Sequence, residues 1–196
     1  MDSNISSYNP KKWNKSNYIK YTHNCYEYAL NDLSYKDAIK CKKKVNNSNN
    51  IDEISKKCSK SKNFSIPGYY KGFNYDGKLT CSKLKKGILL DNPYPILYQS
   101  SKNKKCKPNY YKIASAVDKN NKYLHFYRQH ENNIWSHKPG ILPVTNLDES
   151  QNIIKDLDKA DLNVSNNMQY KICNYFCVSN NNYMSTNNSA KIYKKK

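Results

Sequence analysis

The segment HNCYEYALND, residues 23–32, decides the expected fold, because it places a cysteine at the beginning of an amphipathic helix. Asn24 is a favourable N-cap residue, and Glu27 follows three positions later, as in a capping box. Apolar side chains then recur at helical spacing, at Tyr26, Ala29, Leu30 and Leu33. We therefore expect a helix from Asn24 to about Lys40.

Cys25 falls in the first turn of this helix and is the candidate nucleophile. The free N–H groups and the positive end of the helix dipole would stabilise a thiolate there. Together with the N–H of Cys25 itself, the same groups would form an oxyanion hole. The alternative is a small buried residue of a core helix, which is the usual role of a single cysteine.

The second half of the chain carries strand patterns. We expect strands over residues 110–117, 123–129, 133–138 and 170–178. The second and third form a hairpin, and Thr80 caps a further helix that ends at residues 92–93. Helices followed by antiparallel strands predict an α+β fold, with the cysteine-bearing N-terminal helix packed on a small antiparallel sheet.

Two histidines, His125 and His137, fall in the two strands of the expected hairpin. If the connecting loop is centred on Glu131, they lie directly opposite each other, and one imidazole can orient the other. With another loop length they would not pair so directly, and two ordinary strand histidines are the alternative. No spacing typical of a zinc site, a calcium loop or a glycine-rich phosphate loop occurs, so we expect no metal and no cofactor.

These segments resemble a known family. HNCYEYALND resembles the cysteine-bearing helix of NlpC/P60-like, papain-fold cysteine peptidases, and HFYRQHENNIWSHKPG, residues 125–140, resembles their core hairpin. The order of cysteine, histidine and a polar residue on the next strand matches the family. The resemblance implies a papain-like NlpC/P60-type fold in which Cys25 is the nucleophile, His125 is the general base and later the acid, and His137 orients His125. Asn24 stands where the family usually has Asp.

The chain is more closely similar to a little-characterised subgroup found in bacteria and giant DNA viruses. Its pattern is a Tyr-Asn-Pro and Trp-Asn arm, a His-Asn-Cys-Tyr helix, a Pro-Gly turn, the hairpin and a Thr-Asn-x-Asp tail. Here these elements stand at residues 8–10, 13–14, 23–26, 67–68, 125–140 and 145–148. The resemblance covers roughly residues 8–178. It implies one papain-like domain over 1–178, with a Lys/Asn-rich surface insertion at 42–62 and a polar, basic tail at 179–196.

The charge of the chain limits its partners. Lys and Arg number 34 against 15 Asp and Glu, a net charge of +19, yet Arg128 is the only arginine. Arginine is preferred for specific phosphate and base contacts, so we expect nucleic acid to bind non-specifically if at all. Arg128 itself is expected to stack, to make a bidentate contact or to pair with a carboxylate in the sheet.

The cysteine content and the apolar runs bear on the compartment. The chain has 7 cysteines, an odd number, and its first residues lack the apolar core of a secretory signal. We therefore expect no secreted disulfide framework and no structural zinc, and place the protein in a reducing compartment, the virion or the host cytoplasm. No apolar run approaches the length of a membrane span.

Two functions follow as expectations. The first is a cysteine peptidase or amidase that hydrolyses a peptide or amide bond through a Cys-His-His triad of Cys25, His125 and His137. The second is a minor structural, capsid-associated component of a large DNA virus particle that uses the same fold, with or without activity. Its partners would be other virion proteins.

Overall fold

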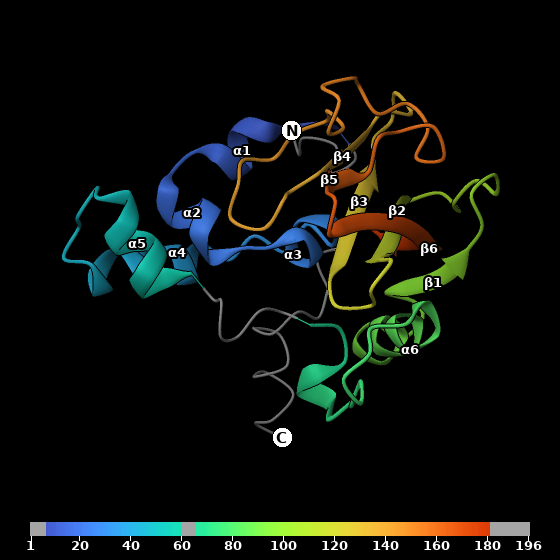
Figure 1. Cartoon of the computed structure of the whole chain (residues 1–196), viewed down its shortest axis with the longest axis horizontal. Helices are drawn as coiled ribbons and strands as arrows, with labels where there is room; N and C mark the ends of the chain where they lie inside the picture. Colours follow the sequence, from blue (N-terminus) through green and yellow to red (C-terminus); the bar gives the residue numbers. More distant parts are fainter. Residues whose placement is uncertain (1–6, 60–65, 181–196) are drawn as a thin grey trace.

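The computed structural model describes residues 7–59 and 66–180 (Figure 1). The helices are α1 (Pro10–Asn14), α2 (Asn17–Thr22), α3 (Cys25–Ala29), α4 (Tyr35–Lys44), α5 (Ile51–Cys58), the 3₁₀ turn η1 (Tyr69–Lys71) and α6 (Cys81–Asp91). The strands are β1 (Leu97–Ser100), β2 (Tyr110–Asp118), β3 (Leu124–Gln129), β4 (Trp135–His137), β5 (Asn163–Ser165) and β6 (Met168–Ser179). Of the tail expected at 179–196, residues 181–196 lie outside the described residues.

The strands build one antiparallel sheet in the order β1-β6-β2-β3-β4, with β5 paired to β6. Neighbouring strands are connected by short turns at the β2–β3 and β3–β4 hairpins, as the strand patterns predicted. The α+β class with a small antiparallel sheet is therefore confirmed. The short edge strands β1 and β5 were not predicted, because each offers only a few residues of strand pattern.

Two apolar layers cover the two faces of the sheet. On one face α3 and α6 pack against the strands through Tyr26, Leu30, Leu84, Ile88, Ile113, Phe126 and Phe176. On the other face lies the irregular segment 145–162, whose Ile154 and Leu157 pack against Tyr127 and Trp135. The sheet is thus buried on both sides, which holds β3 and β4 in place.

The first helix is interrupted, contrary to the expectation of one helix from Asn24 to about Lys40. The chain leaves α3 after Ala29, and Asn31 adopts the left-handed conformation with φ of 57°. Asparagine tolerates this conformation at a helix end, so the helix can end here. The helical spacing of apolar residues nevertheless continues past the break to Leu33. A second helix, α4, then begins after Ser34, whose hydroxyl accepts the N–H of Asp37.

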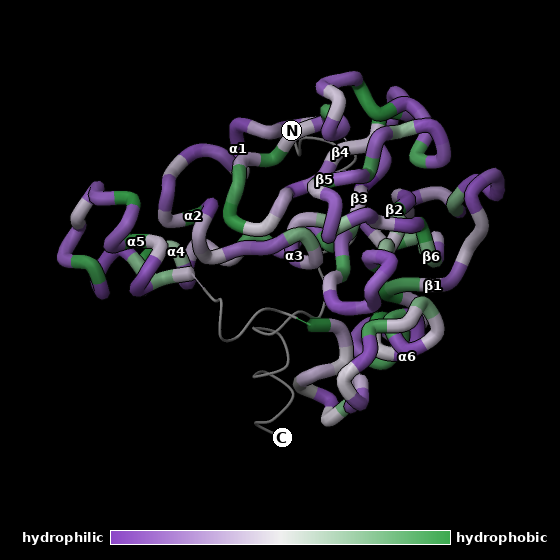
Figure 2. Tube along the Cα trace, in the orientation of Figure 1, coloured by the Kyte–Doolittle hydropathy of each residue, from purple (hydrophilic) through white to green (hydrophobic). Residues whose placement is uncertain are grey.

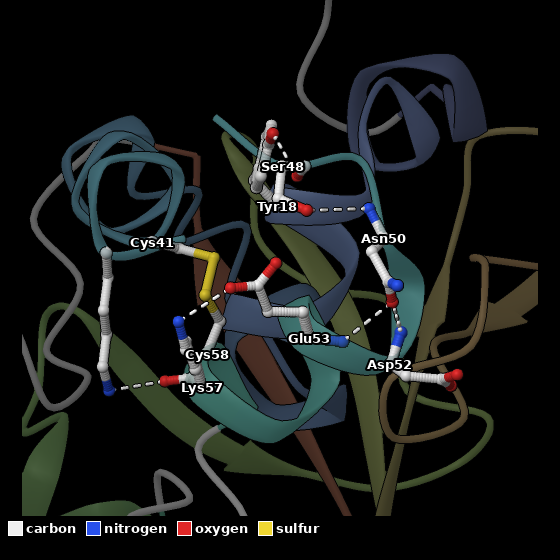
Figure 3. A network of polar contacts seen from close by, with 9 residues as sticks. Tyr18, Cys41, Ser48, Asn50, Asp52, Glu53, Lys57 and Cys58 are labelled. Carbon is white, nitrogen blue, oxygen red and sulfur yellow. Dashed lines mark hydrogen bonds and ion pairs between the residues drawn. A yellow bond between two sulfur atoms is a disulfide. The ribbon is translucent and has the colours of Figure 1, made fainter. Parts of the chain in front are cut away.

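The part of the expected insertion at 42–62 that is described forms an ordered helical hairpin. Helices α4 and α5 lie beyond α2 at one end of the molecule (Figure 1) and show hydrophilic and hydrophobic stretches in alternation (Figure 2). The Cys41–Cys58 disulfide joins the two helices. Tyr18 of α2 donates to the Ser48 carbonyl at 2.8 Å and holds the connecting turn, and the Asn50 side chain caps α5 (Figure 3).

Six of the seven cysteines are paired, so the expectation that the chain has no disulfide framework is wrong. The disulfides are Cys41–Cys58, Cys81–Cys173 and Cys106–Cys177. The last two tie α6 and the loop before β2 to β6, across separations of 92 and 71 residues that no local spacing reveals. Only Cys25 is free. Disulfides persist in oxidising surroundings, which does not by itself fix the compartment, and the virion or cytoplasmic location stays a prediction.

No helix in the described part of the chain is long and apolar enough to cross a membrane.

The disulfide arrangement predicts a specific thiol count. Denatured, unreduced protein should take up one equivalent of iodoacetamide, at Cys25, and reduced protein should take up seven, because six thiols are held in disulfides. Intact-mass and peptide mass spectrometry measure both numbers. Three or more labelled cysteines before reduction would contradict the pairing.

Candidate active site

His125 and His137 meet across the β3–β4 hairpin, although not in the expected register. His137 is paired with Tyr127, so the hairpin is centred on Asn132 rather than on Glu131. The loop length that would pair the two histidines directly is therefore not the one the structure has. They still meet because residues two apart on a strand share a face, which makes His125 the diagonal neighbour of His137.

A chain of hydrogen bonds fixes the proton positions on both rings. His137 Nε2 lies 3.0 Å from the carbonyl oxygen of Leu147, which can only accept, so Nε2 carries the proton. Nδ1 of the neutral His137 ring is then an acceptor, and it lies 2.8 Å from His125 Nε2. His125 Nε2–H therefore donates, and His125 Nδ1 keeps a basic lone pair. The geometry is that of a base and its orienting partner.

The Leu147 carbonyl is held by the strand-like return after β4. The backbone of His137 exchanges two hydrogen bonds with Thr145, at 2.8 and 3.0 Å, and the Thr145 hydroxyl accepts the Leu147 N–H. Next to it, the Asp148 carboxylate accepts the N–H groups of Asn152 and Asp161. The acceptor for His137 is thus part of a closed turn.

Two tyrosines pack against the histidine rings. Tyr127 is stacked on His137 with centroids 5.2 Å apart, and it meets His125 edge to face at 4.9 Å. Tyr170 of β6 also packs against His125, with the two ring centroids 5.3 Å apart. These contacts restrict ring rotation, so both imidazoles are held by packing as well as by hydrogen bonds.

Cys25 sits at the edge of β3 where β4 has left the sheet. His130 N–H bonds to the Ile134 carbonyl on the β4 side, and alternate N–H groups of a strand point the same way. The N–H of Phe126 therefore points to that side too, beyond the last β4 pair at His137. There it faces the Cys25 thiol and lowers the pKa of that thiol, although burial raises the same pKa by more.

Helix α3 is anchored at both ends. At its start the Asn24 side chain and Glu27 form the predicted capping box. At its end the hydroxyl of Tyr111 donates to the Ala29 carbonyl at 3.0 Å, and Arg128 donates to the Asn31 side chain at 3.1 Å. Arg128 also lies over the Tyr111 ring at 4.6 Å, which is one of the three roles considered for it.

The resting cysteine is a neutral thiol, contrary to the expected thiolate. Burial raises the pKa of Cys25 to about 12, and the opposing N–H groups do not compensate. Helix α3 is only five residues long, and the Asn24 side chain already takes the N–H groups of Tyr26 and Glu27. Burial also lowers the pKa of His125 well below 6.5, so the pair rests as thiol and neutral imidazole.

A buried lysine lies beside the thiol. The Lys138 ammonium is fully buried and donates to the carbonyls of Lys20, Gly140 and Leu142 at 2.8, 2.6 and 3.2 Å. Burial lowers the pKa of Lys138 to about 7, and the charge of Cys25 acts in the opposite direction. The Lys138 amine therefore fixes the loop after β4 through three backbone carbonyls and interacts electrostatically with Cys25.

A cavity of about 430 Å³ opens in front of these groups. It is lined by Asn24, Cys25, Ile66, Leu79, Lys122, Tyr123, Leu124, His125, Tyr127, His137, Pro139, Gly140, Leu142, Glu149, Val164, Met168 and Tyr170. All three predicted site residues are in this set, and none of the described residues 42–59 is, so the helical hairpin does not cover the cavity. His23 and His130, to which no catalytic role was given, are outside it.

Other residues of the site were missed by the sequence analysis. Tyr127 could have been found, because it stands two positions after His125 on the same strand face. Tyr170 and the Leu147 carbonyl reach the histidines only through the fold, and Lys138 was hidden among 33 other basic residues. Within residues 7–59 and 66–180, no three His, Cys, Asp or Glu side chains are arranged to hold a metal ion.

Comparisons with protein-family models, curated proteins and solved structures give no match to this chain.

The pKa directions predict how Cys25 reacts with iodoacetamide. Because thiolate is the nucleophile and the pKa of Cys25 is about 12, the alkylation rate of the native protein should rise ~10-fold per pH unit between about pH 6 and 9. Mass spectrometry of quenched samples gives the rate. A rate that stays constant below pH 7 would indicate a thiolate–imidazolium pair instead.

The hydrogen-bond chain predicts the histidine tautomers. At neutral pH the nitrogen-15 NMR spectrum should show both His125 and His137 as Nε2–H tautomers, because the Leu147 carbonyl accepts from His137. In His137→Ala the preference of His125 should weaken, since its acceptor is gone. An Nδ1–H tautomer of His125 in the wild type would show that the proton order is reversed.

Proposed function

We propose that this protein is a cysteine hydrolase of papain-like, NlpC/P60 type that cleaves a peptide or amide bond. The observation that carries the proposal is the hydrogen-bond chain from Leu147 through His137 to His125, which leaves His125 Nδ1 as the base in the cavity that holds the only free cysteine. A nucleophile, a base and an orienting group in one cavity are the parts that acyl transfer requires.

In the first half of the reaction the Cys25 sulfur attacks the carbonyl carbon of the substrate. Because the thiol is neutral at rest, its proton moves to His125 Nδ1 as the S–C bond forms. The resulting imidazolium is held by the His137 Nδ1 acceptor, and the charge of Asp148 favours positive charge at His137. His125 then returns the proton to the leaving amine, and the C–N bond breaks.

The second half is hydrolysis of the thioester. His125, again neutral, takes a proton from water as the oxygen attacks the carbonyl carbon. The S–C bond breaks and the proton returns to the Cys25 sulfur, which releases the carboxylic acid. The oxyanion of both steps would be met by the N–H of Cys25, since Asn24 holds the N–H groups of Tyr26 and Glu27.

The structural alternative, a capsid-associated component of a large virus particle, stays a prediction. The open cavity favours activity over that reading, because no described residue of the 42–59 hairpin fills it.

Variants of the three site residues test the proposal. With p-nitrophenyl acetate and a pool of internally quenched peptides as probes, Cys25→Ala and Cys25→Ser should abolish turnover. His125→Ala should do the same, and His137→Ala should leave residual activity reduced about 100-fold, because the base survives but is no longer oriented.

The control for these variants is the free energy of unfolding in urea. Cys25→Ala should lose at most about 1 kcal/mol, so that its inactivity is not caused by unfolding. Equal rates of wild type and Cys25→Ala on every probe would refute the proposed function.

A further inference from the structure

The mouth of the Cys25 cavity is ringed by exposed apolar side chains from three separate elements. Tyr123 lies in the β2–β3 turn, Leu142 in the loop after β4 and Val164 in β5, and they are 48%, 57% and 48% exposed. Single exposed apolar side chains are ordinary on a protein surface, but they are informative when they gather. Their convergence on one opening indicates a surface that receives an apolar group.

The walls behind this rim are also apolar. Leu79, Leu124 and Met168 also line the cavity, and the ring of Tyr170 packs against that of His125, with centroids 5.3 Å apart. Among the described lining residues, Lys122 and Glu149 are the two charged side chains besides the proposed catalytic groups. Partial burial raises the pKa of Glu149, and so do the charges of Asp161 and Asp148.

We propose that the cavity binds a large aliphatic acyl group, the part of the substrate whose carbonyl carbon forms the thioester with Cys25. This inference rests on the proposed function and names its substrate class. Against the apolar part of these walls a polar or charged acyl group would lose hydration, whereas an aliphatic chain gains by leaving water. Such a group can come from a fatty acid or from an aliphatic amino-acid residue of a peptide.

The reaction step is the one already described. The Cys25 S–C bond forms to the aliphatic acyl carbon, the C–N or C–O bond to the leaving group breaks, and the thiol proton passes through His125 to that leaving group. Water then supplies the hydroxyl of the released acid. The leaving group departs through the open mouth, while the acyl chain stays in the cavity until hydrolysis.

A chain-length series measures the preference. On p-nitrophenyl acetate, butyrate, hexanoate and octanoate, kcat/KM should rise about fourfold per added methylene until the cavity is filled. On N-acetyl-glycine and N-acetyl-leucine p-nitroanilides, leucine should be preferred if the acyl group comes from a peptide. Rates that are the same for acetate and octanoate and also the same for glycine and leucine would overturn the inference.

A pair of exposed leucines provides matched variants. Leu142→Asp, at the mouth, should lower the octanoate-to-acetate ratio of kcat/KM about tenfold. Leu90→Asp, on α6 and 44% exposed but outside the cavity lining, should leave that ratio unchanged. Equal ratios in both variants would show that the rim at Leu142 takes no part in binding the chain.

Alkylation separates this inference from the proposed function, because it needs no hydrolysis. N-octylmaleimide should modify native Cys25 at least tenfold faster than N-ethylmaleimide, after correction for their rates with free cysteine. If this preference appears while no probe is hydrolysed, the hydrolase proposal fails and the acyl-binding cavity stands. If hydrolysis depends on Cys25 but neither chain-length effect appears, the acyl preference alone is refuted.

Discussion

The hydrogen bond from His137 Nε2 to the Leu147 carbonyl is the contact on which the arrangement of the site depends. A carbonyl accepts and never donates, so this single contact determines which nitrogen of His137 is protonated and, through it, which nitrogen of His125 is basic. The return of the chain after β4 toward Thr145 is what brings the carbonyl there. The same return ends the pairing of β4 with β3 and opens the strand edge at which Cys25 lies. One turn of the chain therefore fixes the proton positions of both histidines and leaves open the strand edge at which Cys25 lies.

Much of the fold was visible in the sequence, since its signals are local. The capping box of Asn24 and Glu27, the Thr80 cap and the strand patterns depend on neighbours within a few residues, and each was found where expected. Other features were not visible, either because two local arrangements fit the same pattern or because they depend on distant parts of the chain. The register of the hairpin is one example, because a shift of its centre from Glu131 to Asn132 leaves the local pattern unchanged.

The cysteines show the same limit. An odd number argued for free thiols, but seven equals three pairs and one nucleophile as readily as it equals seven thiols. Only the fold brings Cys81 to Cys173, and no spacing along the chain points to that pair. The meeting of His125 and His137 was predictable, because a register shift of two residues leaves both side chains on the same face of the hairpin. Lys138 was not, because its place beside the site depends on the fold and not on its residue type.

The low polarity around Cys25 has two consequences that reinforce each other. Burial raises the pKa of the thiol and lowers the pKa of His125, so the site rests without separated charge and needs no water to solvate an ion pair. The same apolar walls offer water few hydrogen-bond partners. An aliphatic group that replaces the water is therefore favoured in the cavity. Charge would then develop only when substrate is present, between His125 and the reacting carbonyl, where His137 and the Cys25 N–H are already oriented. The apolar walls that would select an aliphatic acyl group therefore also favour a neutral Cys25 thiol and a neutral His125 imidazole before substrate binds.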